Sequence, residues 1–415
     1  KALLKSAQVY EYIKHADKYG ITLNEQPEAD AAAMVKRSRD VAAGMSKGIQ
    51  FLLKKNKVTH LKGFGKIAGN KKLIVTDEKG SATEYTAEHI ILATGGRTRE
   101  LPNLPIDGKN IIGYRDAMVL TEKPESMVIV GSGAIGVEFA YYYNAIGTKV
   151  TVVEFLPNIV PNEDIDVSKE LAKNFKKSGI DVMTNSAVQS VDTSGKKNKV
   201  KITTKKGEEI IECDVVLSAV GVSTNLEGIG LEEAGVITDK GKVIVDDYYR
   251  TNIPGIYAIG DIVHGPALAH VASAEGIICI EKIAGLDVHG LNYGNIPGCT
   301  YCSPEIASVG LTEVQAKEQG YDIKVGKFPF SASGKASASG AKEGFVKVIF
   351  DAKYGEWLGC HMIGAGVTDM IAEAVVARNL ETTGHEVLKS VHPHPTMSEA
   401  VMEAVAAAYD EVIHI

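Results

Sequence analysis

The sequence lacks the marks of a secreted or membrane protein. Only five of its 415 residues are cysteine, and this small, odd number fits a reducing compartment better than a disulfide framework. No uninterrupted apolar run reaches the roughly 18 residues of a membrane-spanning helix, and no signal-peptide pattern opens the chain. We therefore expect a soluble protein that needs no structural disulfide bonds.

The sequence also lacks an excess of basic residues. Its 45 Lys and Arg stand against 52 Asp and Glu, which gives a net charge of −7, whereas nucleic acids and acidic membranes attract clustered positive charge. Both are therefore disfavoured as main partners, and small molecules are favoured. Glycine is abundant by contrast: the chain has 42, above the ~7% of a typical protein, so glycine turns are expected to matter.

The segments of the chain differ in pattern. Its length suits two or three domains of roughly 150 residues each. Residues 1–55 are predicted to be mostly helical, and residues 126–155 follow the order strand, glycine turn, helix, strand. Beyond residue 292, separate strands precede helices, which is typical of an α+β domain.

Two stretches resemble each other, EHIILATGGRT at 88–98 and CDVVLSAVGVST at 213–224. Each is an apolar strand that runs into a glycine turn, at Gly95 and at Gly221. We interpret them as a weak internal repeat, in which two nucleotide-binding sheets each close on such a strand.

The strongest local signal is the glycine motif Gly131-Ser-Gly133-Ala-Ile-Gly136, which follows a predicted strand and opens a predicted helix. Gly131 permits a tight turn, Gly133 lets the backbone approach a pyrophosphate at the positive end of the helix, and Gly136 allows close packing of helix and strand. The alternative is a glycine-rich turn that binds no ligand. The context of strand and helix favours a dinucleotide.

Glu154 ends the next predicted strand, TVVE. In dinucleotide-binding folds a carboxylate at this place binds the two ribose hydroxyls of the adenosine half. Because the same carboxylate repels the extra phosphate of NADP, the sequence predicts NAD as the cofactor.

A fourth apolar strand, GIYAIGD, stops at Gly260 and Asp261. A carboxylate at the carboxyl edge of a parallel sheet is well placed to bind a ribityl or ribose hydroxyl, although Asp261 would equally serve as the cap of the following helix. Thr94, Gly95 and Gly96 are open to two interpretations in the same way, as a cofactor contact or as a simple turn.

Cys299 and Cys302 form a C-x-x-C pair. Zinc is disfavoured because there is no second pair, and residues three apart on a strand face opposite sides of the sheet. A redox pair is the alternative, but we expect two unrelated cysteines. No metal site is predicted.

Two histidines alternate with prolines in VHPHPTMSEAV at 391–401. Thr396 and Glu399 match a capping box, which predicts a helix over 398–412. No cluster of carboxylates or cysteines completes a metal shell around the histidines. The remaining functional interpretation is a general base, because imidazole titrates near neutrality and a nearby carboxylate raises its basicity.

Taken together, these residues resemble the lipoamide dehydrogenases, within the pyridine nucleotide-disulfide oxidoreductase family, over essentially the whole chain. The resemblance implies an α/β fold with two nucleotide-binding three-layer domains, one for FAD and one for NAD, and a C-terminal α+β dimerisation domain. The implied order is an FAD domain at 1–118, an NAD domain at 119–246, a central segment that returns to the FAD domain at 247–292, and the dimerisation domain at 293–415. The matching stretches are KALLKSA, ILATGGRTRELP, VGSGAIGVEFA, VGVSTN, TNIPGIYAIGDIVHGPALAHVASAEG, YCSPEIASVG and HPHPTMSEAV.

The resemblance also implies roles for single residues. It makes His394 the catalytic base, paired with Glu399, and it makes Glu138 the carboxylate beside the flavin and nicotinamide, with Lys1 as its ion-pair partner. The residues that it assigns to FAD are Thr94, Gly95, Asp261, Ala269 and His270.

The implied activity is the oxidation of dihydrolipoamide by NAD through FAD and a redox disulfide. The family works as a homodimer, and its partners are the lipoyl domains of a 2-oxoacid dehydrogenase complex in bacterial cytoplasm or the mitochondrial matrix. The alternatives are a related NAD(P)H-dependent disulfide reductase and a truncated NAD-binding dimer scaffold without dithiol chemistry. They remain open because the family's C-x4-C disulfide motif, which directly precedes KALL there, occurs nowhere in this sequence; we expect that a segment precedes Lys1.

Overall fold

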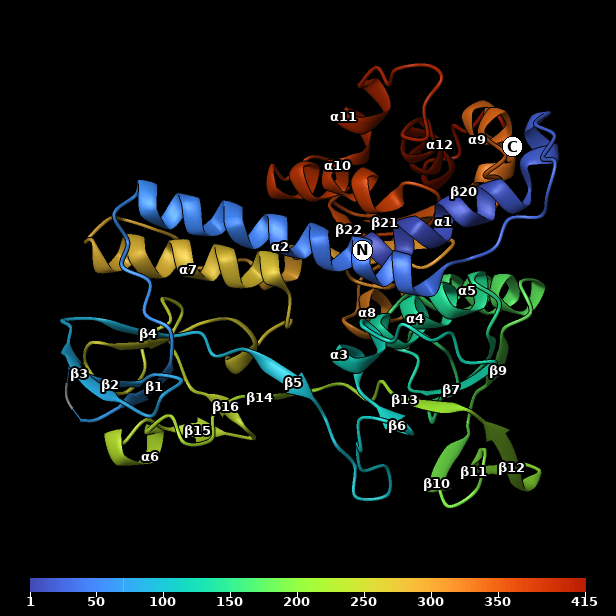
Figure 1. Ribbon diagram of the computed structural model, residues 1–415. Helices are drawn as coiled ribbons and strands as arrows, with labels where there is room; N and C mark the ends of the chain where they lie inside the picture. Colours follow the sequence, from blue (N-terminus) through green and yellow to red (C-terminus); the bar gives the residue numbers. More distant parts are fainter. Residues whose placement is uncertain (70) are drawn as a thin grey trace. The chain divides into compact units, whose positions relative to one another are not determined.

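The computed structural model describes residues 1–69 and 71–415 (Figure 1). The chain divides into two compact units. The larger unit comprises Lys1–Val41, Glu100–Gly221 and Gly294–Ile415, and the smaller unit comprises Ala42–Arg99 and Val222–Tyr293.

A parallel sheet forms the first half of the larger unit. Its five strands lie in the order β6-β13-β7-β8-β9 and all run parallel. The strands are β6 (Ile111–Ile112), β7 (Ser126–Val130), β8 (Lys149–Val153), β9 (Asp181–Met183) and β13 (Val215–Ser218). Because parallel strands are joined by crossovers, helices follow β7 and β8, and these are α4 (Ala134–Ala145) and α5 (Ile165–Lys177).

This sheet is covered on both faces, as its continuous apolar strands require. On one face, Met127 and Ile129 pack against Val137, Leu171 and other residues of α4 and α5, together with α1 (Ala2–Lys14). On the other face, Val128 packs with an antiparallel sheet of three strands, which are β10 (Ala187–Asp192), β11 (Asn198–Thr204) and β12 (Gly207–Cys213). The result is the predicted three-layer nucleotide-binding arrangement.

The C-terminal part of the larger unit is built on a second, antiparallel sheet with the order β18-β19-β22-β21-β20. Two of its inner strands, β21 and β22, are buried along their whole length, because helices pack against the sheet. The strands are β18 (Gly298–Thr300), β19 (Glu305–Gly310), β20 (Ile323–Pro329), β21 (Phe345–Asp351) and β22 (Trp357–Gly364). The helices are α8 (Glu313–Glu318), η4 (Phe330–Ala332), α9 (Gly334–Ser339), α10 (Val367–Asn379), α11 (Gly384–Lys389) and α12 (Glu399–Ala408).

The smaller unit has a parallel pair of strands, β4 (Ile90–Leu92) beside β17 (Ile256–Ala258). Both strands contribute to one apolar core with Ile67 and Val243. Its other strands are β1 (Phe64–Ile67), β2 (Lys72–Thr76), β3 (Ala82–Thr86), β5 (Gly96–Thr98), β14 (Val222–Thr224), β15 (Thr238–Asp239) and β16 (Lys242–Val243). Its helices are α6 (Leu231–Ala234), η2 (Gly260–Ile262) and α7 (Ala269–Ile283).

Helix α2 (Ala31–Lys55) contributes residues to both units. The remaining helices are η1 (Ala16–Tyr19), α3 (Tyr114–Ala117) and η3 (Tyr293–Asn295). The predicted α/β class and the predicted C-terminal α+β arrangement are confirmed. The domain boundaries that the resemblance implies stay predictions. Within residues 1–69 and 71–415, no helix combines the length and apolar character needed to cross a bilayer.

Candidate active site and cofactor cradles

The glycine motif joins β7 to α4 in a tight turn, and two of its glycines are required by packing. A Cβ atom on Gly131 would lie 2.5 Å from the carbonyl oxygen of Ala219, and the backbone at Gly131 has a φ of +99°. A Cβ atom on Gly136 would lie only 2.0 Å from the carbonyl oxygen of Gly131. No other residue fits at either position without moving backbone.

Gly133 is different, because a Cβ atom there would meet nothing within 4 Å. This glycine is the N-cap of α4, and no side chain caps the helix. The first amides of α4 therefore face open space at the positive end of the helix dipole, which is where phosphate binds best. The turn fits the pyrophosphate of a dinucleotide.

Glu154 follows β8 and is buried beside the same turn. Its Oε2 accepts hydrogen bonds from the amide (2.9 Å) and the hydroxyl (2.6 Å) of Ser132, and its Oε1 accepts from the amide of Leu156 at 2.8 Å. The carboxylate thus braces the glycine turn, a role that the sequence did not predict. Its contact with a ribose stays a prediction, as does that of Gly221, which has a φ of +104° and follows the strand next to β7.

Lys1 and Glu138 form the predicted ion pair. The ammonium of Lys1 lies 2.6 Å from Glu138 Oε1 on α4, and it also lies 4.0 Å from the centre of the Tyr301 ring. The amide of Tyr301 donates to the same carboxylate oxygen at 2.9 Å. Three segments far apart in the sequence therefore meet at one carboxylate.

His394 and Glu399 lie together on the segment that leads into α12. Nδ1 of His394 is 2.9 Å from Glu399 Oε1. Because a carboxylate only accepts, Nδ1 carries the hydrogen and Nε2 is the nitrogen left to take a proton. The His394 side chain is 78% exposed, so its Nε2 is accessible to a substrate.

Glu399 is held in its ionised form. Burial alone would raise its pKa, but the pKa is lowered because the amide of Thr396 and the ring of His394 hydrogen-bond to the carboxylate. Only half of the predicted capping box forms, since the hydroxyl of Thr396 donates to the carbonyl of Pro393 and does not cap the helix. The helix begins at Glu399 and ends at Ala408, shorter than predicted.

The residues assigned to FAD lie in the smaller unit, and Thr94, Gly95 and Asp261 follow the carboxyl ends of β4 and β17. Parallel strands bring these ends to one edge. A Cβ atom on Gly96 would lie 3.3 Å from Asp261 Oδ2, so the turn after β4 and the turn after β17 are neighbours. A cofactor hydroxyl at this edge would meet the Asp261 carboxylate, which fits the prediction.

The neighbouring groups are already ordered by the protein. The hydroxyl of Thr94 donates to the carbonyl of Asn225 at 2.6 Å, and the amide of Asn225 donates to the carbonyl of Gly95 at 2.9 Å. The amide of Gly260 donates to the buried carboxylate of Glu275 at 2.6 Å, and no motif in the sequence indicates this role for Glu275. Ala269 and His270 form the exposed first turn of α7.

The C-x-x-C pair has no redox or metal geometry. Cys299 lies on β18 and Cys302 lies beyond its end, and both thiols are free. Burial raises the pKa of Cys299 to about 11 and also raises that of Cys302 well above its usual value, whereas a reactive cysteine needs a lowered pKa. Throughout 1–69 and 71–415, no group of three or more His, Cys, Asp or Glu side chains is placed to hold a metal ion.

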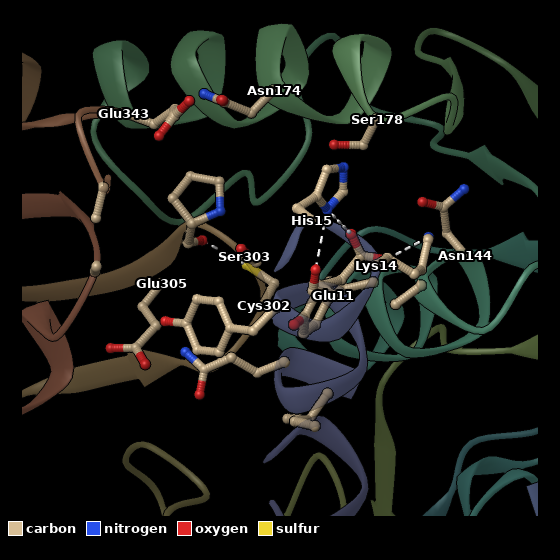
Figure 2. A pocket seen from close by; sticks show the side chains of 18 of the residues that line it. Glu11, Lys14, His15, Asn144, Asn174, Ser178, Cys302, Ser303, Glu305 and Glu343 are labelled. Atoms are coloured by element: carbon tan, nitrogen blue, oxygen red, sulfur yellow. Dashed lines mark hydrogen bonds and ion pairs between the residues drawn. The ribbon is translucent and has the colours of Figure 1, made fainter. Parts of the chain in front are cut away.

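A cleft of about 790 Å³ opens in the larger unit beside Lys1. Figure 2 shows its walls, with Glu11, Lys14 and His15 of the N-terminal segment near Asn144 and Ser178, and with Cys302 and Glu305 on the far side. Among the predicted site residues, Lys1 lines this cleft and His394 and Glu399 do not. The candidate base is therefore presented on the surface of the unit and not in this cleft.

Comparison with known proteins agrees with this geometry. Residues 1–276 match the family model described as pyridine nucleotide-disulphide oxidoreductase, and residues 296–405 match its dimerisation domain. A dihydrolipoyl dehydrogenase of Zymomonas mobilis is 46% identical over all of this chain and 89% of its own length. The mitochondrial dihydrolipoyl dehydrogenase of Pisum sativum is 40% identical over all of this chain and 83% of its own.

Solved structures include a protein with a similar fold. The crystal structure of LpdA from Mycobacterium tuberculosis superposes with a TM-score of 0.91 at 26% identity, covering 98% of this chain and 88% of that one. The resemblance expected from the sequence is confirmed, and its FAD and NAD cofactors are those that the glycine turn and the Asp261 edge fit. The chain belongs to the pyridine nucleotide-disulphide oxidoreductases.

Proposed function

We propose that the protein is a dihydrolipoyl dehydrogenase, which oxidises a dihydrolipoyl dithiol to its cyclic disulfide and reduces NAD⁺ to NADH. The observation that carries this proposal is the His394–Glu399 pair, a histidine oriented by an ionised carboxylate. The pair lies on a chain that also has an NAD-type turn. The dithiol loses two electrons and two protons, of which NAD⁺ takes both electrons and one proton, and the other proton goes to water.

His394 acts as the general base. The thiolate is the nucleophile in thiol–disulfide exchange, whereas the thiol is unreactive. Nε2 takes the thiol proton, and Glu399 fixes the ring tautomer and stabilises the imidazolium that forms.

FAD and NAD, when bound, carry the electron pair from the dithiol side to the nicotinamide. The chain's part is to hold and orient them. For NAD we assign Gly131, Gly133, Gly136, Glu154 and Gly221, and for FAD we assign Thr94, Gly95, Gly260, Asp261, Ala269 and His270. We assign Glu138, with its ion-pair partner Lys1, to the place beside both the flavin and the nicotinamide. The corresponding domains are 1–118 with 247–292 for FAD, 119–246 for NAD and 293–415 for dimerisation.

The reaction also needs a redox-active cysteine pair. The sequence contains no C-x4-C motif, and its five cysteines are all free. Tests of activity therefore use the complete protein with FAD bound.

The dimerisation domain supports a homodimer. We infer that the dithiol substrate is carried by the lipoyl domains of a 2-oxoacid dehydrogenase complex, since the relatives are named for that substrate group. Because relatives come from bacteria and from mitochondria, we propose the bacterial cytoplasm or the mitochondrial matrix as the compartment.

The test is NADH formation, followed by its absorbance, with dihydrolipoamide and NAD⁺ as substrates. We expect His394→Gln to lower kcat by roughly 10²- to 10⁴-fold, the usual contribution of a general base. His289→Gln, at an exposed histidine outside the site, is the matched control. Wild-type turnover by His394→Gln, or turnover of glutathione disulfide with NADPH in preference to dihydrolipoamide with NAD⁺, would contradict the proposal.

A further inference from the structure

His392 has no part in the mechanism above, although it stands two residues from the base. We propose that His392, held by Glu373, is a positioning residue that fixes the loop presenting His394. This inference rests on the proposed function, in which His394 is the base.

The contacts of His392 show that its ring is a cation. Nε2 lies 2.7 Å from Glu373 Oε1, and Nδ1 lies 3.0 Å from the carbonyl oxygen of Ser390. A carbonyl oxygen and a carboxylate both accept hydrogen bonds, so both ring nitrogens must carry a hydrogen. An imidazole with two N–H groups is an imidazolium.

The environment favours that charge. The hydrogen bond that His392 donates to Glu373 raises the pKa of His392, against the opposing effect of burial. The His392 side chain is only 8% exposed, so water screens this pair less than it screens an ion pair on the open surface.

The pair also anchors the loop. Residues 390–398 lie between the end of α11 and the start of α12 and have no helix or strand. Val391, Pro393 and His394 are exposed, whereas His392 is partly buried and Met397, near the other end of the stretch, packs against the core. Its partner Glu373 lies in the middle of α10, a helix whose buried face packs into the core over the sheet. The ion pair therefore ties the irregular segment that bears His394 to a helix that is packed against the core.

The cation acts on the catalytic pair through Glu399. Among the causes that lower the pKa of Glu399 is the charge of His392, and Glu399 in turn raises the pKa of His392. The titratable groups that act on His392 are thus Glu373 from α10 and Glu399 from α12, and Glu399 is shared with His394 on the same loop. Hydrogen bonds join His392 to Glu373 and His394 to Glu399, whereas His392 acts on Glu399 through its charge.

A merely structural ion pair would affect the melting temperature and would leave the pH profile of the reaction unchanged. The positioning role predicts more. Without the cation, the pKa of Glu399 rises, so the acid limb of kcat/KM for dihydrolipoamide moves to higher pH. Without the anchor, His394 is misplaced, and an ångström of misplacement costs up to about 10²-fold.

The experiment compares His392→Gln, Glu373→Gln and the double variant in the complete, FAD-loaded enzyme, with Glu318→Gln on the exposed face of α8 as control. We expect each single variant to lower kcat/KM for dihydrolipoamide about tenfold and to shift its acid limb upward. The double variant should be no worse than the poorer single variant. Reduction of ferricyanide by NADH, which needs no thiol base, should stay at the wild-type rate.

Wild-type pH profiles and rates in both single variants, with at most a lower Tm, would overturn the inference. Should His392→Gln fail to fold, Glu373→Gln decides alone, because it keeps the shape of the side chain and removes only the charge. His394→Gln is measured in parallel. If His394→Gln is inactive while His392→Gln and Glu373→Gln are normal, only the positioning role is wrong; if His394→Gln is fully active, the proposed function itself fails.

Discussion

Gly133 and Gly136 stand three residues apart at the start of α4, yet they are glycine for different reasons. At Gly136 the added Cβ would strike the backbone carbonyl of Gly131, whereas at Gly133 it would enter open space. The sequence motif alone cannot distinguish the two roles, because both residues are glycine. The first is a packing requirement of the fold, and the second leaves room for a ligand.

This difference gives a matched pair of variants. Gly136→Ala forces the helix away from the turn, and we expect it to destabilise the protein by about 1–3 kcal/mol, as overpacking usually does. Gly133→Ala should fold normally, since its φ of −66° suits any residue. It should raise the KM for NAD about tenfold, equivalent to about 1.4 kcal/mol of binding. Thermal unfolding and NAD titrations check both; a normal KM in Gly133→Ala would contradict the assignment of the cradle.

At the scale of elements, a buried lysine joins the NAD-type sheet to the C-terminal sheet within the larger unit. Lys347 on β21 lies 2.9 Å from Asp164, the N-cap of α5, 3.2 Å from Asp166, and 2.8 Å from Glu313 on α8. Burial alone would lower the pKa of Lys347, but Glu313 and Asp164 raise it. One cation thus satisfies carboxylates from two helices, and no local pattern in the sequence indicates it.

Lys347→Met should therefore be severe, because it leaves these carboxylates without their shared cation. We expect a loss of about 3–5 kcal/mol, as for other broken buried pairs. Lys327→Met removes a half-exposed lysine that lies 3.4 Å from Asp166 and should cost less than about 1 kcal/mol. Denaturant titrations of the two variants give the comparison, and equal losses would mean that burial does not set the strength of the cluster.

The same cluster sets a pH dependence. Burial alone would raise the pKa of Asp166, but Lys347 lowers it, and Lys317 with Lys347 lowers the pKa of Glu313. Carboxyls with lowered folded-state pKa values stabilise the fold above their unfolded pKa of about 4, and this stability is lost as the pH falls through the folded values. In Lys347→Met the carboxyls are protonated more readily, so its deficit relative to wild type should be smaller at pH 4 than at pH 7.

At the scale of the whole molecule, the sequence predicts features that depend on neighbouring residues or on a recurring motif. The strand-turn-helix order around Gly131 follows from periodicity and glycine turns, and the pairing of His394 with Glu399 is implied by the family resemblance. The partners Glu373, Glu275 and Lys347 do not follow, because each meets its site only after distant segments pack. The capping role of Thr396 was wrong for a local reason, because its hydroxyl donates to the carbonyl of Pro393, three residues earlier in the loop.

His394 is 78% exposed, and we propose that the second subunit covers this surface in the homodimer. Val376 and Leu380, one turn apart on α10 and just past it, are 57% and 68% exposed, and they lie within the dimerisation domain on the segment that follows Glu373. Exposed apolar side chains at such a place are expected to be covered by the partner copy. His394 would then work only in the dimer.

Val376→Asp with Leu380→Asp should accordingly weaken the dimer. We expect the dimer dissociation constant to rise by about 10²-fold, which corresponds to about 2.7 kcal/mol, since two charges would be buried at an apolar contact. Dihydrolipoamide oxidation should fall on dilution in parallel with the dimer seen by sedimentation velocity. Ile210→Asp is the control, because Ile210 is 65% exposed on β12, outside the dimerisation domain. Should the double variant stay dimeric while its activity still falls, α10 would act on the base through Glu373 and not through the partner subunit.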